Sequence, residues 1–211
     1  LEAVLLDLDN TLVMFDETLY VKSYFERLTP WFSDVYAPEE LQKRVLSATY
    51  GLRENKGLVS NREFFLNRFD GGGNGRRGEI WSRFLEFYEK DYSGIQIPVS
   101  TPDGLPEVLF WLARSSLKVV LASNPVFPRI AQETRMGWGK IAAKHFDLFT
   151  HIENMAFVKP NVGYCQQICD MLRTPPAACL MVGNDPEADM VAKKAGLKTY
   201  LTSDAAEAGC A

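Results

Sequence analysis

The amino-acid sequence predicts an α/β fold, in which a doubly wound parallel sheet carries an inserted α-helical domain. Two observations predict it. An apolar strand at the start of the chain is followed by a long stretch of helical pattern, residues 15–96, and from residue 97 onward helices and strands alternate. Because a single strand cannot form a sheet, the first strand must join the later ones. The helical stretch is therefore an insertion.

The first strand covers residues 3–6 and continues to Leu8, a run of apolar side chains typical of a strand in the middle of a parallel sheet. Asp7 and Asp9 lie at its carboxyl end, the edge at which open α/β sheets bind ligands. Two carboxylates this close repel each other unless a cation or a shared proton offsets them. The pair therefore indicates a Mg²⁺ site beside a nucleophilic carboxylate. A plain turn is the alternative, because Asp and Asn favour turns.

Helical periodicity dominates residues 15–96, where no convincing strand is found. One helix is expected to begin at Pro38 and another to cover residues 61–69. The glycine-rich stretch 71–78 favours a flexible connection over a phosphate-binding loop, because such loops need a preceding strand. We expect the aromatic residues of this region to form its own core rather than a substrate site, namely Phe64, Phe65, Trp81, Phe84 and Tyr88.

The rest of the chain has the alternating pattern of a parallel sheet with helices on both faces. Strands are expected at 117–122, within 146–152, at 178–182 and at 198–201, and helices after 103 and over 127–135, 161–172 and 186–195. The expected domains are an α/β core of residues 1–14 and 97–211 and a helical domain of residues 15–96.

Polar residues follow each of four predicted strands. The carboxyl ends of parallel strands meet at one edge of a sheet, so these residues are expected to converge. Carboxylates, a hydroxyl and a lysine suit phosphoryl transfer, which depends on positioning and on neutralising charge. In chain order the residues are Asp7 and Asp9, then Ser123 and Asn124, then Lys159, and then Asn184, Asp185 and Asp189.

These segments resemble, in type and order, the four motifs of the haloacid dehalogenase (HAD) superfamily. The resemblance spans nearly the whole chain, and it implies a Rossmann-like core and a phosphoric monoester hydrolase. A helical insert between the first two motifs is similar to the helical cap domain of that superfamily. The four matching segments are Asp7-Leu8-Asp9-Asn10-Thr11, Ser123, Lys159-Pro160 and residues 183–189.

The resemblance implies a catalytic or binding role for five residues. Asp7 would be the nucleophile that forms an aspartyl phosphate, and Asp9 would be the general acid and base. Ser123 and the amide of Asn124 would bind the phosphoryl oxygens. Lys159 would bind the substrate phosphate as well and neutralise charge on Asp7 and on the phosphoryl group.

A Mg²⁺ cofactor is also implied, held by Asp7, the backbone carbonyl of Asp9 and an acidic residue of the fourth motif. The family often has Asp directly after the glycine of that motif, where this chain has Asn184. We expect Asp185 to bind the metal, because hard cations favour carboxylate oxygens. Asn184 and Asp189 are the alternatives.

Asp9 distinguishes chemistries within the superfamily. True haloacid dehalogenases lack an acidic residue at this position, attack carbon and need no Mg²⁺. We therefore expect a Mg²⁺-dependent phosphatase that hydrolyses a small phosphorylated metabolite through an aspartyl phosphate. The alternatives are a phosphomutase, a 2-haloacid dehalogenase and a catalytically idle binding module.

Composition restricts the partners. The 211 residues include 23 basic and 27 acidic ones, a net charge of −4, which gives no electrostatic footprint for nucleic acid. No apolar run approaches the roughly 20 residues that span a bilayer, and no signal peptide is visible. The spacing of the four cysteines predicts buried thiols of a reducing compartment, at Cys165, Cys169, Cys179 and Cys210. We therefore expect a cytoplasmic protein that binds a small phosphate ester; no particular oligomeric state is indicated.

Overall fold

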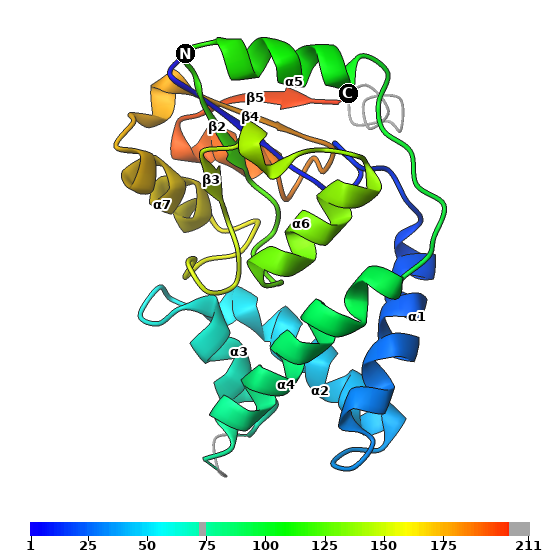
Figure 1. Cartoon of the computed structure of the whole chain (residues 1–211). Helices are drawn as coiled ribbons and strands as arrows, with labels where there is room; N and C mark the ends of the chain where they lie inside the picture. The colour runs from blue at the N-terminus through cyan, green and yellow to red at the C-terminus, as the bar shows by residue number, and fades with distance from the viewer. Residues whose placement is uncertain (72–74, 203–211) are drawn as a thin grey trace.

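The computed structural model describes residues 1–71 and 75–202 (Figure 1). Within them, five parallel strands form one sheet in the order β3-β2-β1-β4-β5. The first strand lies at the centre, where Leu6 is paired with Leu121 of β2 and Val182 of β4. This confirms the predicted parallel α/β fold. The strands are β1 Ala3–Leu6, β2 Lys118–Leu121, β3 Leu148–Phe149, β4 Cys179–Gly183 and β5 Lys198–Leu201.

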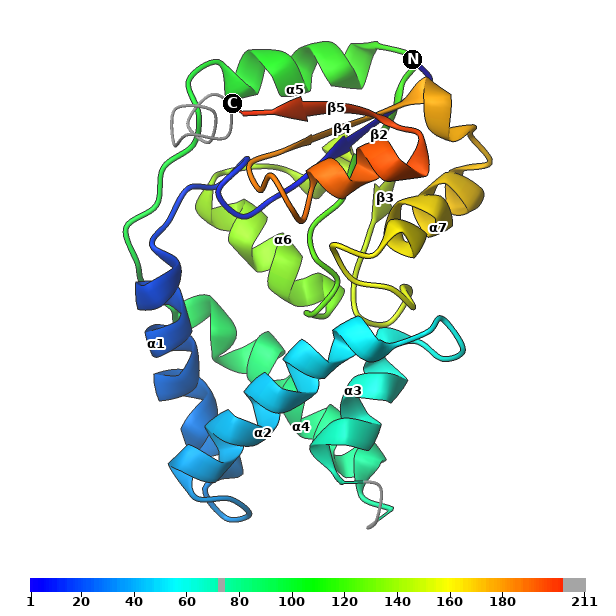
Figure 2. The same cartoon turned by 180° about the vertical axis from the view of Figure 1, so that it is seen from behind.

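Helices cover both faces of the sheet (Figure 2). Side chains alternate between the faces along a strand. Val4 and Leu6 therefore pack with α5 and α6, whereas Ala3 and Leu5 pack with α7 and the 3₁₀ helix η6. This is the doubly wound arrangement that the alternating pattern predicts. These helices are α5 Leu105–Arg114, α6 Arg129–Trp138, α7 Val162–Leu172 and η6 Met190–Ala195, and short 3₁₀ helices η4 Ala143–His145 and η5 Pro176–Ala178 accompany them.

The last helix begins later than the sequence indicates. A helix was expected over 186–195, but the chain first forms a turn, and only Met190–Ala195 is helical. Two carboxylates explain why the helix begins only at Met190. Asp185 accepts hydrogen bonds from two backbone N–H groups of the turn, at 2.7 Å each, and Asp189 accepts one from the backbone of Asp185, at 3.0 Å. These local bonds replace the first helical ones.

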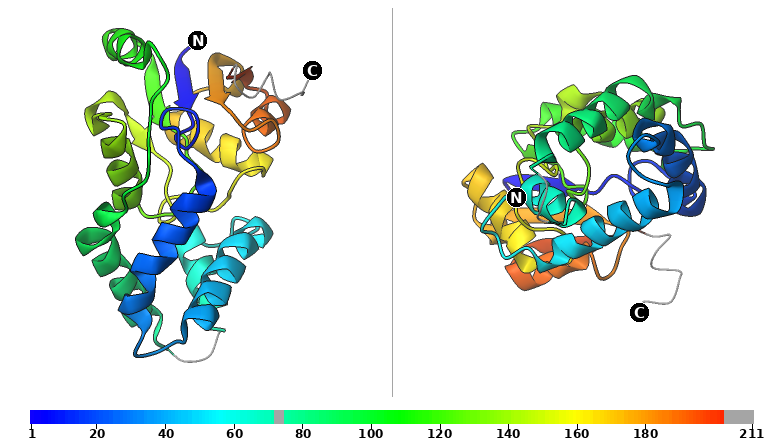
Figure 3. Two further views of the ribbon diagram at one scale, coloured as in Figure 1. Left: turned by 90° about the vertical axis from the view of Figure 1, so that its right-hand side faces the viewer. Right: turned by 90° about the horizontal axis from the view of Figure 1, so that it is seen from below.

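The inserted helices lie together beneath one end of the sheet (Figure 1; Figure 3, left). Asp16 caps the first helix by accepting two backbone N–H groups, Ser60 caps the third, and Pro38 begins the second, as predicted. The helices are α1 Glu17–Leu28, α2 Pro38–Gly51, α3 Asn61–Phe69 and α4 Arg77–Lys90, with short 3₁₀ helices η1 Thr29–Phe32, η2 Leu52–Glu54 and η3 Tyr92–Gly94. Part of the glycine-rich connection, residues 72–74, lies outside the described residues.

Two separate sets of backbone hydrogen bonds join the insertion to the core. The two connecting segments run side by side, and Met14 and Ser100 exchange hydrogen bonds of 2.8 and 3.1 Å. At the other side, the N–H of Asn61 donates to the carbonyl of Met155 at 2.7 Å, and the Asn61 side chain donates to the carbonyl of Phe157 at 3.1 Å. The start of α3 is therefore held directly against the core.

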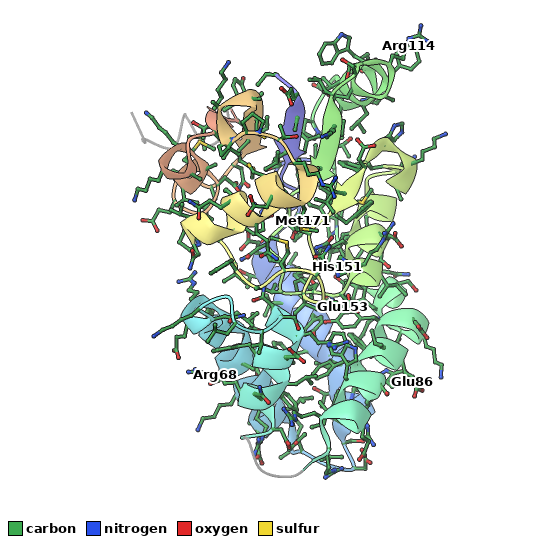
Figure 4. The ribbon with its side chains drawn as sticks, turned by 90° about the vertical axis from the view of Figure 1, so that its left-hand side faces the viewer. Arg68, Glu86, Arg114, His151, Glu153 and Met171 are labelled. Atoms are coloured by element: carbon green, nitrogen blue, oxygen red, sulfur yellow. The ribbon has the colours of Figure 1, made fainter. Side chains whose placement is uncertain are left out.

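The loop after β3 supplies the core side of this second junction. The carbonyl of Ile152 accepts a hydrogen bond of 2.8 Å from the N–H of Arg62. His151 and Glu153, which flank Ile152, lie between the sheet and the insertion (Figure 4), with 2.8 Å between Nδ1 and Oε2. This loop therefore fixes where α3 meets the core.

The cysteines lie in the core, as expected. Cys165, Cys169 and Cys179 are buried free thiols beneath one face of the sheet, and Cys210 lies outside the described residues. Burial raises the pKa of Cys165 to about 11 and that of Cys169 to about 12, so both thiols stay protonated at neutral pH. Over the ranges that the structure describes, none of the helices combines the length and apolar character needed to cross a membrane.

Candidate active site

The two carboxylates of the first motif leave β1 through a tight turn. Backbone N–H groups of the turn return to the carbonyl of Leu8, at 2.9 to 3.3 Å. Asn10 has φ 60°, a left-handed conformation that Asn tolerates better than most residues, and its side chain accepts the N–H of Phe15 at 3.0 Å. The turn places Asp7, which is nearly buried, and the more exposed Asp9 at the edge of the sheet.

Lys159 connects the first motif with the fourth. Its Nζ donates to Asp7 Oδ1 at 2.7 Å and to Asp189 Oδ1 at 2.5 Å, and all three side chains are at most 10% exposed. A buried charge needs such partners. Burial alone would lower the pKa of Lys159, but the two carboxylates outweigh it and hold that pKa above its usual value. The lysine therefore stays charged at the sheet edge.

Opposing effects act on the pKa of Asp7. Burial raises the pKa of Asp7 to about 6, although the Lys159 ammonium lowers it, and repulsion from Asp189 and Asp9 adds to the rise. A cation bound beside Asp7 would favour its ionised form.

The fourth motif brings Asn184 close to Asp7. Thr11 Oγ1 lies 3.1 Å from both Asp7 Oδ2 and Asn184 Oδ1, so one hydroxyl bridges the first and fourth motifs. Gly183 allows Asp189 to lie close against the end of β4, because a Cβ at residue 183 would overlap the Asp189 carboxylate. Asp185 uses Oδ1 to fix the turn after β4, and within the described residues its Oδ2 has no hydrogen-bond partner.

The second motif follows β2. Asn124 Oδ1 accepts the backbone N–H of Lys159 at 3.2 Å, and Asn124 lines the same cavity as Asp7 and Lys159. Ser123 is 1% exposed, and its carbonyl accepts hydrogen bonds from Thr150 and Tyr164. Its hydroxyl makes no hydrogen bond within the described part of the chain. The structure thus brings the predicted site residues to one edge of the sheet, but Ser123 is buried and is not among the residues that line the cavity.

Arg135 is a site residue that the sequence analysis missed. This α6 residue is fully buried, and its Nε donates to Asp9 Oδ1 at 2.8 Å. Its Nη1 donates to Tyr92 Oη at 2.9 Å and lies 3.5 Å from Tyr20 Oη, so the guanidinium links Asp9 to the insertion. The available signal was its place on the buried face of α6, one position before Met136.

A cavity of about 360 Å³ lies between the sheet edge and the insertion. The carboxylates, Lys159, Asn124 and Asn184 line one side of it. Helices α1 to α4 line the other side, largely with aromatic residues, and Phe127 of the core joins them. The aromatic residues that these helices contribute include Tyr20, Tyr24, Tyr50, Phe65, Trp81, Phe84 and Tyr88. As expected, the core of the insertion includes Phe65, Phe84 and Tyr88. Together with Trp81 they also line the cavity, whereas the sequence analysis expected them to form an internal core only.

The donor atoms at the edge suit a hard divalent cation. Mg²⁺ prefers oxygen ligands, and the edge offers carboxylates, the Asn184 amide oxygen and the backbone carbonyl of Asp9. Among the described residues, no three His, Cys, Asp or Glu side chains lie in a metal-binding cluster. A cation bound here would also need amide or backbone oxygens as ligands.

Comparisons with known proteins agree with this geometry. A family model described as haloacid dehalogenase-like hydrolase matches residues 1–196. No curated protein sequence matches the chain. Three similar structures are a HAD family enzyme from Bacteroides thetaiotaomicron in complex with magnesium and inorganic phosphate, a HAD phosphatase from Thermococcus onnurineus and a 2-haloacid dehalogenase from Pseudomonas syringae pv. Tomato DC3000.

The similarity to these structures is one of fold. The Bacteroides enzyme is 16% identical, with a TM-score of 0.56, and the match covers 96% of this chain and 94% of that one. The Thermococcus protein is 18% identical with a TM-score of 0.55, and the match covers 96% of this chain and 86% of that one. The Pseudomonas protein is 17% identical with a TM-score of 0.63, and the match covers 100% of this chain and 90% of that one. With the family model covering nearly the whole sequence, this chain belongs to the haloacid dehalogenase-like hydrolases and is an enzyme of that family.

Proposed function

We propose that this protein is a Mg²⁺-dependent phosphatase that hydrolyses a small phosphate ester through an aspartyl phosphate on Asp7. The observation that carries the proposal is the buried Asp7–Lys159–Asp189 network, which borders a cavity that Asp9 also lines. A nucleophile, a cation and a second carboxylate are the groups that phosphoryl transfer requires. A similar fold that holds magnesium and inorganic phosphate supports the same chemistry.

In the first half of the reaction, a carboxylate oxygen of Asp7 attacks phosphorus. The ester P–O bond breaks, and Asp9 gives its proton to the leaving oxygen. Lys159 neutralises charge on Asp7 and on the transferring group, and Asp189 holds the ammonium in place. Asn124 and Ser123 bind phosphoryl oxygens from the end of β2.

In the second half, Asp9 removes a proton from water, and the water oxygen attacks the aspartyl phosphate. The bond between phosphorus and Asp7 breaks, which releases inorganic phosphate, restores the Asp7 carboxylate and leaves Asp9 protonated for the next cycle. Arg135 holds one oxygen of Asp9 at 2.8 Å and leaves the other for proton transfer. Arg135 thus acts as a positioning residue.

Asp7, the backbone carbonyl of Asp9 and a side-chain oxygen of the fourth motif would hold the Mg²⁺ ion. When bound, it supplies positive charge that offsets the carboxylates and the phosphoryl oxygens. Asp185 remains the predicted ligand, through its unused Oδ2. The position of Asn184 beside Asp7 favours its amide oxygen as the alternative, and Asp189 is already engaged by Lys159.

Phosphate release from a simple aryl phosphate tests the proposal. The Mg²⁺-loaded protein should release phosphate, and the Asp7→Asn variant serves as the blank. Release of halide from 2-haloacids without phosphate release from any ester would contradict it. Return of the phosphoryl group to a sugar phosphate would identify a phosphomutase, and inactivity in all three assays would indicate a binding module.

We also propose that the insertion acts as a cap domain, residues 15–96, which excludes water and selects the substrate. The aromatic wall that it contributes to the cavity supports this role. Its hinges would lie near residues 13–16 and 95–99, in the two connecting segments that Met14 and Ser100 join. Substrate protection of these segments from proteolysis would be the expected sign of closure.

A further inference from the structure

The cavity has one charged side and one apolar side. The charged side carries Asp7, Asp9 and Lys159, the groups proposed to react with or neutralise the phosphoryl group. The other side is built from aromatic rings of the insertion, such as Tyr24, Phe65, Trp81 and Phe84, together with aliphatic side chains such as Val45 and Leu46. The apolar side faces the place where the organic part of a phosphate ester would lie.

Three of the four tyrosines in this wall have paired hydroxyls, and the fourth, Tyr50, is 65% exposed. Tyr24 Oη and Tyr88 Oη pair at 2.9 Å, and Tyr20 Oη pairs with Tyr92 Oη at 2.8 Å. Burial raises the pKa of Tyr20, Tyr24 and Tyr88, so these side chains remain neutral. A polyhydroxylated ligand would lose its hydrogen bonds to water here and regain few of them, which is costly.

The charges that line the cavity disfavour a second anion on the ligand. Lys159 is the one cation among its described lining residues, and it already pairs with Asp7 and Asp189. The insertion contributes Glu17, a further negative charge. Arg135, behind the wall, is paired with Asp9. A carboxylate or second phosphate would therefore be desolvated with no free cation to receive it.

We infer that the substrate is a phosphate monoester whose organic group is apolar, uncharged and of aromatic character. This inference rests on the proposed phosphatase function and specifies its substrate class. The phosphate occupies the sheet edge, and the organic group packs against Trp81 and its neighbours in the cavity of about 360 Å³. Sugar phosphates and phosphorylated carboxylic acids are poor substrates.

The test compares esters with similar alkyl leaving groups, so that leaving-group acidity does not decide the result. The Mg²⁺-loaded enzyme is assayed with 2-phenylethyl phosphate, glycerol phosphate, glucose 6-phosphate and phosphoglycolate. We expect kcat/KM for 2-phenylethyl phosphate to exceed the others by about tenfold or more, the scale of discrimination that apolar pockets achieve. Equal or better hydrolysis of the polar esters would overturn the inference and leave the phosphatase function intact. Absence of phosphate release from every ester, aryl phosphates included, would overturn both.

Two variants examine the wall itself. Trp81→Ala should raise KM for 2-phenylethyl phosphate several-fold and raise that for glycerol phosphate much less, and Trp111→Ala, at an exposed residue of α5, is the matched control. Thr49→Lys adds a cation to the wall and should improve kcat/KM for phosphoglycolate. Titration calorimetry with the Asp7→Asn variant should rank the esters in the same order without turnover. A uniform effect of Trp81→Ala on all esters would contradict the inference.

Discussion

The two sides of the cavity are built in different ways. The charged groups at the sheet edge have partners of opposite charge or hydrogen bonds, and Lys159 Nζ lies within 2.7 Å of a carboxylate oxygen of both Asp7 and Asp189. The helical wall is held together by ring packing and by hydroxyl pairs such as Tyr24–Tyr88. In the proposed function, the sheet edge carries out the reaction and the helical wall selects the substrate.

The largest expected effect comes from Asp7, the proposed nucleophile. Asp7→Asn keeps the shape of the edge but removes the attacking carboxylate, so phosphate release should fall by about 10³-fold or more. Steady-state kinetics with an aryl phosphate measures the loss, and an unchanged circular dichroism spectrum excludes misfolding. Substantial residual activity would assign the nucleophile to another residue.

Removing the buried cation should affect both activity and stability. Lys159→Met leaves Asp7 and Asp189 facing each other without a counter-charge, which should cost about 3–5 kcal/mol in the free energy of unfolding. Urea denaturation measures this change in the free energy of unfolding, and Lys193→Met, at an exposed lysine, is the control. A loss no greater than that of the control would mean that the network contributes nothing to the fold.

Arg135 is the direct link between the two sides. Arg135→Met frees Asp9 from its 2.8 Å contact, and we expect kcat to fall by about 100-fold, the effect of small misplacements in an active site. Arg129→Met, on the exposed face of the same helix, is the matched control. Partial recovery in Arg135→Lys would support a positioning role, and an unchanged pH profile of kcat in Arg135→Met would exclude one that acts through Asp9.

The metal ligand of the fourth motif can be decided by affinity. Asp185→Ala is expected to weaken Mg²⁺ binding by about tenfold or more, because it removes a carboxylate oxygen. Calorimetric titration of Mg²⁺ into Asp185→Ala and Asn184→Ala separates the two candidates. Unchanged affinity in the first variant and a loss in the second would assign the ligand to Asn184.

The smallest expected effect concerns the wall. Tyr24→Phe removes the hydroxyl that pairs with Tyr88 and should lower the free energy of unfolding by about 1 kcal/mol. Because the ring remains, hydrolysis of an apolar ester should change little. Exposed Tyr200→Phe is the control for thermal unfolding. A large loss of activity would mean that the hydroxyl itself contacts substrate.

Most of the sheet and its edge could be predicted because their signals are local. The apolar run before Asp7 predicts a central strand, and parallel strands carry Asn124 and Lys159 to the same edge. The start of the last helix could not be predicted, since the carboxylates of Asp185 and Asp189 replace the first helical bonds. Helical spacing indicated which aromatic faces are buried, but not that Trp81 also borders the cavity.

The strand ends, the acidic pair, the lysine and the helical insertion can be identified in the sequence, because each depends on neighbouring residues and their periodicity. The contact of Arg135 with Asp9 and Tyr92, and the aromatic wall opposite the charged edge, become visible only in the folded molecule. These contacts join residues far apart in the chain. Their geometry depends on how whole helices pack, which no local pattern specifies.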